Sequence, residues 1–250
     1  MESQQPAAAQ LAALRTMPNR PSTATLLDTK EGTVAIGRHA DGSDATLELF
    51  SPEGPVCAAI TGRPGSGIGA LLDTLWDAEE ASGLVESWVV DLDGTHIANR
   101  PLTHRADTVA RAAELVAEAS ALVLDRWHKG LSGAGYEEYR PTAERKLATL
   151  TLVGVTGLLE QDKRIQAHLE TIARWAALGG LHLRTVDRPG RWASGALGRS
   201  MRDGSLIELL AGGPAIDGEQ ALPGTGLLTQ PFVEQGELFR TWPPMPGATP

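Results

Sequence analysis

The chain has 250 residues, of which 42% are hydrophobic, and its 31 acidic and 22 basic side chains give a net charge of −9. This length and apolar content suit one large α/β domain rather than two, and the negative charge argues against a broad nucleic-acid surface. The single cysteine, Cys57, excludes an internal disulfide and points to the cytoplasm. No apolar stretch approaches the ~20 residues of a membrane span, so we expect no direct membrane insertion.

The first part of the chain predicts a leader followed by a hairpin. Residues 1–28 are rich in Ala, Gln, Pro, Ser and Thr, which predicts a flexible leader with at most a short helix over 7–17. Residues 33–37 and 45–50 alternate in polarity around the turn pair Asp41-Gly42. This pattern predicts an N-terminal β-hairpin.

A glycine-rich loop follows the hairpin. An apolar strand over 56–61 leads into the loop, and a helix is predicted over 69–81, which together have the shape of a P-loop. In the template G-x-x-x-x-G-K-[ST], the lysine position holds Ile68 and the hydroxyl position holds Gly69. Neither residue can grip the β- and γ-phosphates or ligate Mg²⁺. The candidate nucleotide-binding residues of this degenerate loop are Gly62, Arg63, Pro64, Gly65, Ser66, Gly67, Ile68 and Gly69.

The rest of the chain alternates strands and helices, which predicts a mainly parallel sheet flanked by helices. The final residues, 243–250, predict a disordered tail. The expected elements are a strand over 87–94, a helix over 107–129, a loop over 130–140, a strand over 147–155, a helix over 163–178, a strand over 181–186, a helix over 194–201, a strand over 205–210 and a hairpin around 227–228 and 238–242.

Charged residues follow two of these strands. Asp91 and Asp93 end one strand, and Asp187 and Arg188 follow another. Ligands bind at the carboxyl ends of strands in open α/β sheets, so these four residues are candidates for a cleft. The aspartates could hold a metal or cap a loop, and no third partner is evident in the sequence. The histidines lack the spacing of a zinc site, so we expect no metal centre.

The order of these motifs resembles the motor domain of the FtsK/SpoIIIE/TraB family of DNA translocases over residues 32–242. The resemblance implies a RecA-like P-loop NTPase fold for residues 29–242. Composition gives an impression of an actinobacterial source. The matching stretches are 34–42, 89–94, Asp125-Arg126, Tyr139-Arg140-Pro141, 180–183, Asp187-Arg188-Pro189 and 222–226.

The departures from the family fall on its catalytic positions. Where the family's Walker B strand ends in Asp-Glu, this chain has Gly154 and Val155, and Asp187 replaces a polar residue that would face phosphate. Residues 176–178 replace a Gly-Arg-Ala segment. Positioning and charge neutralisation supply nearly all of phosphoryl-transfer catalysis, so the resemblance and its departures together predict a pseudo-ATPase with no catalytic residues.

This interpretation implies a subunit that assembles with itself or with a protein partner, such as an active FtsK/TraB-like translocase. DNA binding is disfavoured because the family's winged-helix domain is absent from this sequence and the net charge is unfavourable. Two alternatives stay open. Arg63 and the loop amides could retain binding of ATP and Mg²⁺ or weak activity as a DNA translocase, or the vacated cleft could bind another anionic small molecule.

Overall fold

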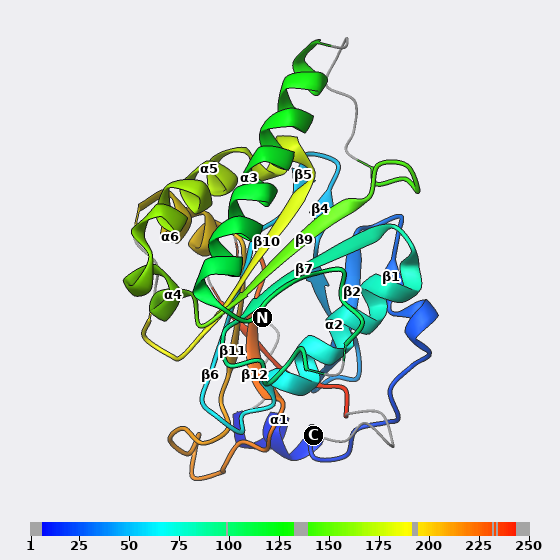
Figure 1. Ribbon diagram of the computed structural model, residues 1–250. Helices are drawn as coiled ribbons and strands as arrows, with labels where there is room; N and C mark the ends of the chain where they lie inside the picture. Colours follow the sequence, from blue (N-terminus) through cyan, green and yellow to red (C-terminus); the bar gives the residue numbers. More distant parts are fainter. Residues whose placement is uncertain are drawn as a thin grey trace.

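The polypeptide is described by a computed structural model over residues 7–98, 100–132, 140–191, 195–231, 233 and 235–243. Within these residues the chain forms an 11-stranded sheet with helices against both faces (Figure 1). The strands of this sheet are β1 (Leu27–Asp28), β2 (Thr33–His39), β3 (Asp44–Glu48), β6 (Ala58–Gly62), β7 (Val85–Asp91), β8 (His104–Ala106), β9 (Leu147–Val153), β10 (Leu181–Asp187), β11 (Ser205–Leu209), β12 (Thr225–Thr229) and β13 (Glu237–Thr241).

The helices and the remaining short strands lie between these sheet strands in the chain. They are α1 (Ala7–Ala13), the 3-10 turn η1 (Thr23–Thr25), α2 (Ile68–Ser82), α3 (Val109–Ser132), α4 (Val155–Gln161), α5 (Lys163–Gly179) and α6 (Gly195–Asp203), with the two-stranded pair β4 (Phe50–Ser51) and β5 (Gly54–Pro55).

The sheet has a parallel half and an antiparallel half. The strands β11, β6, β10, β9, β7 and β8 pair in that order and in parallel. β12, β13, β2, β1 and β3 extend the other side with antiparallel pairs. Parallel strands buried on both faces are rich in apolar residues, and every residue of β6 is buried. The predicted α/β fold, with a mainly parallel centre flanked by helices and an N-terminal β-hairpin, is confirmed.

Two clusters of buried apolar residues hold the helices on the sheet. On one face of the sheet, α2 packs against strands that include β2 and β3, through residues such as Leu71, Leu75 and Trp76. α3 and α5 cover the other face, beside α4 and α6 (Figure 1). Asp162 caps α5, because its carboxylate accepts from the Arg164 backbone N–H at 2.9 Å.

The segment expected to be a flexible leader has packed contacts in its described part. Leu11, Leu14 and Leu26 are buried. Arg20, with a side chain only 3% exposed, pairs with Asp77 of α2 at 3.0 Å. Residues 7–28 therefore lie against the domain, and the boundaries at 28 and 242 stay predictions. The tail beyond residue 243 lies outside the described residues.

Most predicted elements agree with the structure to within two or three residues, but the region after β9 does not. The strand predicted over 147–155 ends at Val153, and a short helix, α4, that the sequence did not predict begins at Val155. One reason is that Gly154 has φ 71°, a left-handed conformation that ends a strand and favours glycine. The helix predicted to end at 129 runs to Ser132, and most of the expected loop over 130–140 lies outside the described residues.

The buried His182 on β10 gives the fold a predicted dependence on pH. It is 0% exposed, and burial holds its pKa well below the usual 6.5, assisted by the nearby Arg184. The folded chain therefore keeps His182 neutral while the unfolded chain takes up a proton below about pH 6.5. Stability present above that pH should fall by up to about 1.4 kcal/mol per pH unit below it.

The measurement is urea unfolding of the wild type and of His182→Asn between pH 7.5 and pH 5. The variant should lose part of the acid dependence whatever its stability at neutral pH. An unchanged slope would show that His182 does not contribute to it.

Candidate functional site

The carboxyl ends of four parallel strands meet at one edge of the sheet. The register aligns Thr61 of β6 with Asp187 of β10, Val186 of β10 with Val153 of β9, and Val153 with Asp91 of β7. The glycine loop leaves β6 at this same edge and leads into α2. Ligand sites of open α/β folds lie at this edge.

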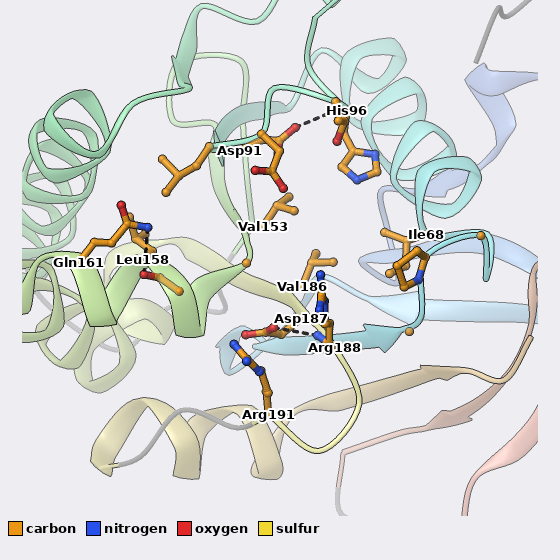
Figure 2. Close-up of a pocket in the computed structure, with 18 residues that line it drawn as sticks. Ile68, Asp91, His96, Val153, Leu158, Gln161, Val186, Asp187, Arg188 and Arg191 are labelled. Carbon is orange, nitrogen blue, oxygen red and sulfur yellow. Dashed lines mark hydrogen bonds between the residues drawn. The ribbon is translucent and has the colours of Figure 1, made fainter. Parts of the chain in front are cut away.

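A cleft of about 660 Å³ opens at these strand ends, a volume in the range of small-molecule sites. Figure 2 shows Asp91 and His96 on one side, Asp187, Arg188 and Arg191 across from them, and Val153 and Val186 between. The cleft is lined by Gly62, Pro64, Gly65, Ile68, Asp91, Leu92, Asp93, Thr95, His96, Val153, Gly154, Gly157, Leu158, Gln161, Val186, Asp187, Arg188 and Arg191.

The glycine loop is tightly constrained against its surroundings. A Cβ atom at Gly62 would overlap Ser66 Oγ and lie 3.1 Å from Ile68 Cδ1, so the side chain at the lysine position lies close to the first glycine. Gly67 has φ +105°, and a Cβ there would lie 2.5 Å from the Gly224 nitrogen. The Gly224 N–H donates to the Ser66 carbonyl at 2.7 Å. The loop is therefore braced by the turn around Gly224.

The side chain of Asp187 caps the N-terminus of α4, although Asp187 belongs to β10 and not to that helix. The residue preceding α4, Gly154, has no side chain to offer. Asp187 Oδ2 accepts from the Thr156 N–H at 2.9 Å, and Oδ1 accepts from the Arg188 N–H at 2.8 Å. A carboxylate suits the positive end of a helix. Since a fixed negative group already holds this position, a phosphate there would meet like charge.

Asp91 is the most deeply buried charged side chain of the cleft. It is 1% exposed, and its Oδ2 accepts from the His96 N–H at 2.8 Å. Its Oδ1 has no hydrogen-bond partner among the described residues. Asp93, two residues on, lies on the exposed rim of the same cleft.

The cations of the region lie on the rim. Arg188 lines the main cleft, whereas Arg63 lines a smaller hollow beside it with Pro64, Arg188 and Pro189. Sequence reasoning did not select Arg191, His96 or Gln161 as cleft residues. The spacing of Arg191, three residues after Arg188, was the one available signal. Ser66, Gly67 and Gly69 belong to the loop but do not line the cleft.

The residues present do not fit ATP and Mg²⁺. The lysine position is Ile68, and the hydroxyl position is Gly69. The end of β9 offers Val153, Gly154 and Val155, without a carboxylate to order a metal. Among the described residues, no three His, Cys, Asp or Glu side chains converge on a point that could hold a metal ion.

Comparison with known proteins gives structural neighbours alone. No protein-family model matches the chain, and no curated protein matches its sequence. Among solved structures, ATPases 2 and 3 of EccC from Thermomonospora curvata, in complex with a signal sequence peptide, align with a TM-score of 0.67 and 14% identity, covering 90% of this chain and 43% of that one.

Two further neighbours have the same fold. The pCW3 conjugation coupling protein TcpA, in its monomer form with ATPgS, aligns with a TM-score of 0.66 and 14% identity over 91% of this chain and 70% of that one. ATPases 2 and 3 of EssC from Geobacillus thermodenitrificans align with a TM-score of 0.65 and 16% identity over 94% and 49%. The chain spans less than half of the EccC and EssC chains. It has the fold of a P-loop ATPase domain of this type.

Proposed function

We propose that this chain is a non-catalytic P-loop subunit, a pseudo-ATPase of FtsK/TraB-like type that works by assembly or by binding a protein partner. The observation that supports the proposal is that apolar side chains form the bottom of the cleft, which we call the cleft floor. Ile68, Val153 and Val186 line the space at the strand ends, where phosphoryl transfer needs a lysine, a metal-ordering carboxylate and a polar group. A site that cannot neutralise a triphosphate has no means to hydrolyse one.

The scaffold around this floor is intact, which supports a role for the fold itself. The loop keeps its glycine conformations and its brace at Gly224. The neighbours are named as a type VII secretion ATPase and a conjugation coupling protein, and two of them contain paired ATPase domains. By analogy, this chain would act beside other ATPase domains in the cytoplasm, as a second copy or next to an active translocase. None of the helices in the described ranges has the length and apolarity of a membrane span.

The main alternative, which the test must distinguish from a non-catalytic subunit, is that the chain still binds a nucleotide. It would rely on Arg63, which lies outside the main cleft, and on the amides of the glycine loop. An anionic ligand other than ATP would use Arg188 and Arg191 on the rim. The carboxylate of Asp187 next to Arg188 weighs against both alternatives.

The test is to restore the two lost loop residues and compare affinities for Mg·ATP by calorimetry. Ile68→Lys with Gly69→Ser adds the charge and the hydroxyl, and the serine has room, because a Cβ at Gly69 meets only His96 atoms at 3.6 and 3.8 Å. We expect the double variant to bind Mg·ATP at least about tenfold more tightly than the wild type.

A neutral control, Ile68→Gln with Gly69 unchanged, should stay as weak as the wild type. A wild type that binds as tightly as the restored variant would contradict the proposal.

A further inference from the structure

Asp91 is a buried carboxylate that the proposed function does not use. It is 1% exposed, one oxygen is held by the His96 N–H, and Oδ1 has no hydrogen-bond partner within the described part of the chain. Burying an ionised carboxylate without a compensating charge or donor is strongly unfavourable. Such a group at the wall of a cleft indicates a ligand that supplies the missing donor.

No charged side chain around the cleft supplies Asp91 with the missing donor within the described residues, so the donor must come from a ligand. Asp187 is occupied by two backbone N–H groups, and Arg188 and Arg191 lie beside it, across the cleft from Asp91 (Figure 2). Within the described residues Asp91 forms no ion pair. The wall at Asp91 is therefore negative and lacks a resident cation.

The floor of the cleft next to Asp91 is apolar, while the polar residues Asp93, Thr95 and His96 also line the cleft. Val153 pairs with Asp91 across the β7 and β9 strands, and Val186 pairs with Val153 in turn. Ile68 faces the same cleft from the start of α2. This arrangement suits methylene groups that lead to a charged head. A bare metal ion fits less well, because metal sites need several converging oxygen or nitrogen ligands and no such cluster occurs in the described ranges.

We propose that the cleft binds a primary ammonium or guanidinium group on an aliphatic chain. The cation pairs with Asp91 Oδ1, and the chain lies over Ile68, Val153 and Val186. A free diamine and the Lys or Arg side chain of a protein partner share this chemistry. The inference rests on the proposed function, since a nucleotide at the glycine loop would take up part of the same cleft.

The experiment is a calorimetric titration of the full chain with 1,5-diaminopentane and, separately, with the capped tripeptides acetyl-Gly-Lys-Gly-amide and acetyl-Gly-Arg-Gly-amide. We expect saturable binding of at least one of them. Asp91→Asn should weaken it roughly 30-fold or more, because the charge pair is lost. Asp93→Asn is the matched control on the exposed rim, and its affinity should stay within about threefold of the wild type.

The titrations with the diamine and with the tripeptides distinguish a small molecule from a protein side chain as the source of the cation. Tighter binding of a tripeptide supports a partner's side chain, and tighter binding of the diamine supports a small molecule. Absence of binding in every arm, or equal affinity in Asp91→Asn, would overturn the inference. Saturable binding of MgCl₂ that depends on Asp91 would overturn it in favour of a metal. A parallel titration with Mg·ATP reports on the proposed function by itself.

Thermal unfolding without any ligand gives a second readout. Asp91→Asn removes the buried charge, while the Asn oxygen can still accept from the His96 N–H. We expect its melting temperature to rise by about 2–4 °C, as binding residues are often unfavourable for stability. A purely structural role for Asp91 predicts a fall instead, which would count against the inference.

Discussion

Replacement of Arg184 by methionine is expected to lower the free energy of unfolding by about 3–5 kcal/mol. Arg184 on β10 and Glu79 on α2 are both 0% exposed, and their side chains pair at 2.5 Å. Glu79 also accepts from Ser87 at 2.6 Å and Thr149 at 3.0 Å. Removal of the guanidinium leaves the Glu79 charge buried with only two hydroxyl donors, which is the most costly way to break such a network.

The control for Arg184→Met is the double variant with Glu79→Gln. Removing both charges avoids the stranded carboxylate, so the double variant should be more stable than Arg184→Met alone. Urea unfolding of the wild type and both variants at pH 7.5 measures the difference. A single variant within about 1 kcal/mol of the wild type would show that the pair does not stabilise the fold. The pair matters for the site because it fixes α2, which begins at the glycine loop, to β10, which ends at Asp187.

Substitution of Gly67 by alanine is expected to destabilise the domain by at least about 3 kcal/mol. Two effects act together. The φ of +105° disfavours any residue with a Cβ, and that Cβ would lie 2.5 Å from the Gly224 nitrogen and 2.8 Å from its Cα. Both contacts are to backbone, so relief requires moving the turn that donates to the Ser66 carbonyl at 2.7 Å.

Gly65→Ala provides a matched control two residues away in the same loop. Gly65 has φ +79°, but a Cβ there meets no atom within 4 Å, so only the backbone strain of about 1–2 kcal/mol applies. Thermal and urea unfolding should rank Gly67→Ala well below Gly65→Ala. Equal losses would show that the contact with Gly224 does not hold the loop in place.

The fold was predictable because its strongest signals are local. The largely apolar β6, the turn pair Asp41-Gly42 and the periodic α5 each have the pattern of the structure that they adopt. The short helix α4 was not predictable in the same way. Its first residue, Val155, continues the apolar run of β9. The break depends on the φ of Gly154 and on the carboxylate of Asp187, which accepts from the Thr156 N–H 31 residues earlier in the chain.

The site was predictable in its position but not in its contacts. The rule that ligands bind at strand ends selected Asp91, Asp93, Asp187 and Arg188, and all four line the cleft. The roles of these residues depend on contacts with residues far away in the sequence, which cannot be predicted from the spacing of motifs. Asp187 caps α4, and Asp91 is buried with one oxygen, Oδ1, that has no hydrogen-bond partner among the residues that the structure describes. Arg63, the candidate substitute for the missing lysine, lines a neighbouring hollow rather than the main cleft.

The most direct test of the pseudo-ATPase account is the titration of the purified wild-type chain with Mg·ATP, followed by an assay for released phosphate. The account predicts no saturable heat at millimolar nucleotide and no phosphate above the level of a protein-free control. Saturable binding with steady turnover, reduced when Arg63 or Asp91 is changed, would contradict it.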